Sequence, residues 1–143
     1  MKNKFYTLIL TLFCFIFLSK NVNANEPFTF NVTEIEILEN GNQINGFKGG
    51  KATSKDGSTI TAENFFYNKL TNILETTGDV KYRDKIKNII ITADKAIYLK
   101  NEETIFTIGN SKAVNESNTI TASNLEYDKN KNIFKAKKKC CSF

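Results

Sequence analysis

The stretch at residues 60–67 reads ITAENFFY, and it recurs as ITADKAIY at 91–98 and as ITASNLEY at 120–127. The three copies begin 31 and 29 residues apart, and a weaker copy precedes them over residues 32–49. Repetition at a nearly fixed spacing indicates one supersecondary unit that is used several times. Such units must stack on one another to bury a shared core.

Apolar and polar side chains alternate inside each copy, as at Ile60 and Ala62. This alternation predicts a strand with one buried face, and the many β-branched residues favour strand over helix. The tyrosine that ends each copy falls on the opposite parity, at Tyr67, Tyr98 and Tyr127. The strand is therefore either bulged near its middle or turns its tyrosine to the other face, and the sequence leaves both open.

Polar segments rich in Asn, Asp and Gly separate the apolar stretches, as at residues 55–58 and 128–132. Such segments are typical of tight turns between strands. We therefore predict an all-β fold of consecutive antiparallel strands in a rolled or folded sheet. Each repeat of about thirty residues would supply two or three of these strands.

The N-terminus has the pattern of a secretory signal peptide. Lys2 and Lys4 precede an apolar stretch over residues 5–18, and the small-x-small sequence at 22–24 predicts cleavage after Ala24. The apolar stretch is short for a bilayer span, and a retained membrane anchor is the alternative. We expect residues 1–24 to be the signal peptide of an exported protein.

The C-terminus departs from the repeat. The third copy should reach its glycine near position 138, but residues 137–143 read KKKCCSF. We expect one β domain over residues 25–136, followed by this basic, cysteine-containing tail. The tail is either natural or the product of a reading-frame slip that truncates a longer parent.

Charge and composition argue against several functions. Once the lysines of the leader and tail are removed, 13 basic residues remain against 15 acidic ones. No basic stripe remains that could neutralise several phosphates, so we expect no nucleic-acid binding. The chain has no histidine, and its cysteines are Cys14, Cys140 and Cys141. We therefore expect no metal, no cofactor and no disulfide framework.

One repeated position carries a carboxylate in two copies, as Glu63 and Asp94, and Ser123 in the third. A pair of carboxylates could catalyse glycoside hydrolysis. Interchangeable polar residues at a repeated strand position are more typical of a solvated face. We therefore expect the protein not to be an enzyme.

The repeat unit, Ile-x-Ala-x-x-x-x-Tyr followed by an apolar pair and Gly-x-Val, resembles the OstA-like domain of the lipopolysaccharide transport machinery. One copy with this whole pattern runs from Ile60 to Val80, and the resemblance extends over about residues 28–136. It implies an antiparallel β-jelly roll, or β-taco, whose apolar trough holds the acyl chains of lipopolysaccharide. It also implies a periplasmic location, association with the outer membrane and end-to-end strand addition with other OstA-like domains. The family includes a periplasmic bridge protein and the N-terminal domain of an outer-membrane translocon, and the sequence does not choose between them.

The resemblance gives candidate site residues. The expected trough residues are Ile60, Ala62, Ile91, Ala93, Ile120 and Ala122. The expected contacts to the phosphates of lipid A, at the mouth of the trough, are Lys81, Arg83 and Lys85. The same apolar positions are also compatible with a closed core that holds no ligand. In that case the protein would be a structural β-solenoid or sandwich that pairs through its strand edges.

Overall fold

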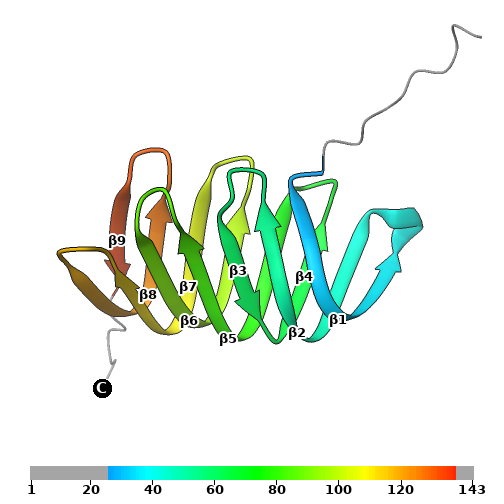
Figure 1. Ribbon diagram of the computed structural model, residues 1–143, viewed down its shortest axis with the longest axis horizontal. Helices are drawn as coiled ribbons and strands as arrows, with labels where there is room; N and C mark the ends of the chain where they lie inside the picture. Colours follow the sequence, from blue (N-terminus) through cyan, green and yellow to red (C-terminus); the bar gives the residue numbers. More distant parts are fainter. Residues whose placement is uncertain (1–25, 138–143) are drawn as a thin grey trace, which may run out of the picture.

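The computed structural model describes residues 26–137, and these form a single antiparallel β-sheet (Figure 1). The strands are β1 (Phe28–Leu38), β2 (Gln43–Ser54), β3 (Thr59–Ala62), β4 (Asn64–Asn68), β5 (Ile73–Asp84), β6 (Ile89–Leu99), β7 (Thr104–Val114), β8 (Thr119–Asp128) and β9 (Ile133–Lys137). The short 3-10 turn η1 (Glu39–Gly41) joins β1 to β2. The predicted signal peptide, residues 1–24, and residues 138–143 of the predicted tail lie outside the described residues. The all-β, antiparallel fold class is confirmed.

The strands follow chain order along the sheet. The order is β1-β2-β3-β5-β6-β7-β8-β9, and β4 pairs with β2 and β5 beside β3. Figure 1 shows them arrayed along the long axis of the molecule, from β1 at the right to β9 at the left. Among residues 26–137 no helix is long and apolar enough to cross a membrane.

The sheet bends along a line through the middle of its long strands. Residues 50–53 of β2 pair with β3, whereas residues 43–46 of the same strand pair with β4. The pairing of β6 with β7 is likewise interrupted between Thr92 and Lys95. We call the part of the sheet that contains β3 the β3 leg and the part that contains β4 the β4 leg.

The interruption decides the open question about the tyrosines in favour of a bulge. In β6, Ile91 and Ala93 are buried before the bend, and Ala96 and Tyr98 are buried after it. At the bend β5 and β7 each have one residue more than β6, and in β6 two residues instead of one separate the buried Ala93 from the buried Ala96. This irregularity shifts the parity, so that the tyrosine returns to the same inner face as the isoleucine. Tyr67 and Tyr127 are 0% exposed, in line with the same shift in the neighbouring copies.

Glycines with positive φ occupy the bend where it is most crowded. Gly78 has φ +80° and Gly109 has φ +76°. A Cβ atom on Gly78 would lie 2.8 Å from Cβ of Glu63, and one on Gly109 would lie 3.0 Å from Cγ of Asp94. Asn110 also donates a hydrogen bond of 2.9 Å to Asp94. The repeated carboxylate position, interpreted from sequence as a solvated face, thus also covers the glycine of the bend.

The inner faces of the two legs meet and fill the interior with side chains. The ring centroids of Phe28, from the β3 leg, and Tyr67, from the β4 leg, lie 5.3 Å apart. Those of Tyr82 and Tyr98 lie 6.4 Å apart across the same interior. Edge-to-face aromatic pairs at such distances stabilise a core beyond simple area burial. The two legs therefore hold one continuous apolar interior.

Candidate functional site

The six expected trough residues line the inner wall of the β3 leg and its bend. Ile60 and Ile91 are 2% and 1% exposed, and Ala62 and Ala93 are both 7% exposed. Ile120 and Ala122 are partly buried and pack against the same core at its C-terminal end. The residues thus share one surface, and in the middle of the domain that surface is covered by the opposite leg.

The apolar inner wall is uncovered at both ends of the described domain. At the N-terminal end, Ile35 and Ile37 are 54% and 60% exposed. Ile37 pairs directly with Ile44, which is buried, so both point to the inner face. At the C-terminal end, β9 pairs with residues 124–128 of β8, so that among the described residues Ile120 has a neighbouring strand, β7, on one side alone.

The expected phosphate contacts lie on the outside of the molecule. Lys81 and Arg83 are exposed and alternate along β5 with inward-facing residues such as Tyr82. With Lys85 they border a surface hollow of about 380 Å³ on the outer face of the β3 leg. None of the three takes part in an ion pair among the described residues. Any phosphate that they bind would therefore lie against the outer face rather than on the inner wall.

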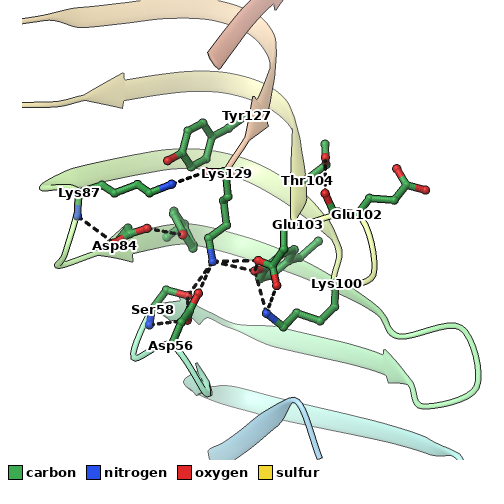
Figure 2. Close-up of polar contacts among 12 residues, drawn as sticks. Asp56, Ser58, Asp84, Lys87, Lys100, Glu102, Glu103, Thr104, Tyr127 and Lys129 are labelled. Atoms are coloured by element: carbon green, nitrogen blue, oxygen red, sulfur yellow. Dashed lines mark hydrogen bonds and ion pairs between the residues drawn. The ribbon is translucent and has the colours of Figure 1, made fainter. Parts of the chain in front are cut away.

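A buried lysine joins turns of the two legs on the side of the interior opposite the bend. Lys129 lies in the turn between β8 and β9 and is only 5% exposed. Figure 2 shows its ammonium group between Asp56 and Ser58, in the β2–β3 turn, and Glu103, in the β6–β7 turn. The first turn belongs to the β3 leg and the second to the β4 leg. One side chain thus joins the rims of both legs.

The contacts of Lys129 account for its burial. Its Nζ atom forms an ion pair with Asp56 and lies 3.1 Å from Oε2 of Glu103. It also donates to the hydroxyl of Tyr98 at 2.9 Å and lies 5.9 Å from the ring centroid of Tyr82. Lys87, from the β5–β6 turn of the β3 leg, donates a hydrogen bond to the backbone carbonyl of Lys129. A buried ammonium group is tolerated only when it is paired and hydrogen-bonded, as it is here.

Two carboxylates of this cluster have altered acidity. Burial by itself would raise the pKa of Asp56, but hydrogen bonds from Lys129 and Ser58 outweigh it and hold the pKa below its usual range. The pKa of Glu103 is lowered in the same way, against burial, by hydrogen bonds from Lys100 and Tyr98 and by Lys129. The pKa of the Tyr98 hydroxyl is raised, first by burial and then by its hydrogen bond to Glu103.

These pKa shifts predict that the folded domain loses stability in acid. A carboxylate with a lowered folded pKa stabilises the fold above its unfolded pKa, and that stability is lost as the pH falls through the folded pKa. The free energy of unfolding should therefore decline below about pH 5. In Asp56→Asn this decline should be smaller, because the carboxylate that becomes protonated is missing. The difference should be about 1 kcal/mol and no more, because solvent screens the partly exposed carboxylate. Urea unfolding at neutral and acidic pH measures both chains, and an equal decline in the two would contradict the role given to Asp56.

Sequence reasoning missed this cluster, although the repeat carries a signal for it. A lysine stands two residues after the tyrosine in every clear copy, at Lys69, Lys100 and Lys129. Each forms an ion pair at the rim: Lys69 with Glu26, Lys100 with Glu103, and Lys129 with Asp56 and Glu103. The repeated Tyr-x-Lys pattern could therefore have identified the rim lysines before the structure was known. The acidic partners from the β3 leg, Glu26 and Asp56, carry no such pattern.

The residue five positions after each tyrosine is also part of the rim. The hydroxyls of Tyr67 and Tyr127 lie 2.9 Å and 3.0 Å from the side-chain oxygens of Asn72 and Asn132. Tyr98 donates to Glu103 at the equivalent position.

Among residues 26–137 no group of three His, Cys, Asp or Glu side chains could hold a metal ion.

These features define an all-β protein whose antiparallel strands fold into two legs around a shared apolar interior, the β-jelly roll or β-taco arrangement. The same fold occurs in the crystal structure of LptH, the LptA-homologous periplasmic component of the conserved lipopolysaccharide transport device from Pseudomonas aeruginosa. The match has a TM-score of 0.71 and covers 82% of this chain and 86% of that chain, at 15% sequence identity. No family model matches the sequence, and no curated protein is significantly similar to it.

Proposed function

We propose that this protein is a transport module that shields the acyl chains of lipopolysaccharide in its apolar interior on the way to the outer membrane. The proposal places it in the periplasm, after export by the N-terminal signal peptide. The protein would act by binding and release, without a catalytic step and without a cofactor. Each methylene group that leaves water contributes about 0.8 kcal/mol to such binding.

The observation that carries the proposal is a single apolar interior, in the fold of LptH, with its wall uncovered at both ends. The isoleucines at the N-terminal end, Ile35 and Ile37, are large, apolar and more than half exposed. Apolar residues exposed together on a concave wall favour a ligand or a partner rather than water. An acyl chain is apolar and flexible, so it could cover these exposed isoleucines.

The basic residues on the outer face would bind the head group of the lipid rather than its acyl chains. Lys81, Arg83 and Lys85 would contact phosphates of lipid A that lie against the outside of the β3 leg. Arginine and lysine side chains without a carboxylate partner are suited to phosphate groups.

Photo-crosslinking in the full chain tests the proposal. A photo-reactive amino acid at Ile37 or Ile120, on the uncovered ends of the inner wall, should form an adduct with lipopolysaccharide. Excess lipid A should abolish the adduct. Ile91 is a poor position for the label, because its side chain is 1% exposed and a larger group would disrupt the core.

Adjacent outward-facing positions provide the controls. Glu36 and Thr121 are exposed neighbours of the two labelled positions on the opposite face of their strands. They should give little or no adduct. Equal labelling on both faces, or no labelling of a folded chain at any position, would contradict a lipid-binding interior.

A second candidate function is assembly through strand edges. Among the described strands, β1 pairs only with β2, and β9 pairs only with β8. Unpaired edges of this kind can add a strand from another chain. Under this alternative, copies join end to end without a lipid. Sedimentation at increasing concentration tests it, since edge pairing predicts growing oligomers in lipid-free buffer and a concentration-independent monomer would contradict it.

A further inference from the structure

We infer that Lys129 is a latch on the long side of the interior, and that an acyl chain enters from this side only when the contact between Lys129 and Asp56 breaks. This inference rests on the proposed function and adds to it how access to the same interior is controlled. The bend closes one long side of the interior with continuous backbone. The opposite long side runs between the turns of the two legs.

The turns of the two legs are joined at two places along that side. Near the N-terminal end, Lys69 of the β4 leg pairs with Glu26, which precedes β1, at 2.6 Å. Further along, Lys129 of the β4 leg pairs with Asp56 of the β3 leg, and Lys87 of the β3 leg bonds the carbonyl of Lys129. The rest of the side carries no ion pair between the legs among the described residues. The polar contacts between the turns are therefore few, and beneath them the two legs meet only through side-chain packing such as that of Phe28 on Tyr67.

The Lys129 contact is the more demanding of the two to break. The side chain of Lys69 is 29% exposed, so solvent can replace its partner at little cost. The side chain of Lys129 is 5% exposed and lies over the rings of Tyr82 and Tyr98. These rings belong to the inner wall, so the aliphatic part of Lys129 also covers apolar surface that an acyl chain would contact. Movement of this one side chain would uncover the wall and release the β2–β3 turn together.

Two substitutions remove the latch in different ways. Lys129→Met keeps an unbranched apolar side chain but removes the charge, and Asp56→Asn removes the charged partner in the β3 leg while Lys129 keeps Glu103. Asp56→Asn is the milder change, so it still tests the latch if Lys129→Met folds poorly. Lys131→Met is the matched control, because Lys131 lies in the same turn, is 72% exposed and, among residues 26–137, forms an ion pair with Asp128 alone.

The first measurement is the rate at which the full chain takes up pyrene-labelled palmitate, followed by fluorescence. Both latch variants should take up the probe about tenfold faster or more, the change expected when a hydrogen bond to a charged group is lost. The control should match the unsubstituted protein. Access through the two ends is the same in all four chains, so a difference in the rate of uptake reports access from the side between the turns.

The second measurement is hydrogen exchange without lipid in the turns at residues 55–58 and 129–132. Exchange in both turns should be faster in the two latch variants and unchanged in Lys131→Met. Binding of palmitate at equal rates by all four chains would overturn the latch and leave the proposed function intact. Failure of every chain to bind the probe would overturn the proposed function, and the latch with it.

Discussion

Replacing Ile91 with glutamate is expected to prevent the domain from folding. Ile91 is 1% exposed and lies on the inner wall, opposite Tyr82 in the pairing of β5 with β6. Loss of the buried isoleucine costs about 2–5 kcal/mol. The unpaired carboxylate adds several kcal/mol more, so the total approaches the whole stability of a small domain, about 5–15 kcal/mol. Circular dichroism and urea unfolding of the purified chain should show no cooperative transition.

The neighbouring residue provides the control. Ile90 precedes Ile91 on the same strand, is partly exposed on the outer face and pairs with Arg83 across the strands. Ile90→Glu places its carboxylate beside a guanidinium group in solvent, so it should change the free energy of unfolding by less than about 1 kcal/mol. Equal damage from the two substitutions would mean that β6 does not have one inner and one outer face.

Replacing Gly109 with alanine is expected to have the next largest effect. The backbone at Gly109 has φ +76°, which costs an alanine about 1–2 kcal/mol. The new methyl group would also collide with the carboxylate of Asp94, and relief of such overpacking costs about 1–3 kcal/mol. The free energy of unfolding, measured by urea denaturation, should fall by about 2–5 kcal/mol.

Gly57→Ala separates the two contributions. Gly57 has φ +82°, but a Cβ atom there would have no neighbour within 4 Å. It should lose only the backbone part, about 1–2 kcal/mol. Adding Asp94→Ala to Gly109→Ala should recover part of the larger loss, and strict additivity of the two changes would show that the carboxylate and the glycine are not coupled.

The sequence was sufficient to predict the strands and their antiparallel order, because both follow from local patterns. Alternation fixes which residues of a strand share a face, and the turn segments fix where the chain reverses. The tyrosines show the limit of this reasoning. Their reversed parity was compatible with a bulge or with an outward side chain, and the register shifts in the pairings of β5 with β6, β6 with β7 and β7 with β8 show the bulge.

The contacts across the interior could not be predicted. Lys129 meets Asp56 across 73 positions of sequence, and the meeting depends on how the two legs bend and twist relative to each other. The repeat pattern predicts that Lys69, Lys100 and Lys129 occupy equivalent places, but it contains no information about partners from the other leg. In the same way, alternation showed that Lys81 and Arg83 share a face without showing that this face is the outer one.

The filled interior has a consequence for the thermodynamics of loading. Side chains such as Tyr67, Leu74 and Ile105 are 0% exposed, so little water is present in the middle of the domain to be expelled. An acyl chain that enters there exchanges contacts between protein side chains for contacts with itself, and the apolar surface that leaves water is mainly its own. Binding should therefore have a smaller negative heat capacity change than the combined areas of ligand and wall suggest. Release should be correspondingly inexpensive, because the legs regain their own packing when the chain departs.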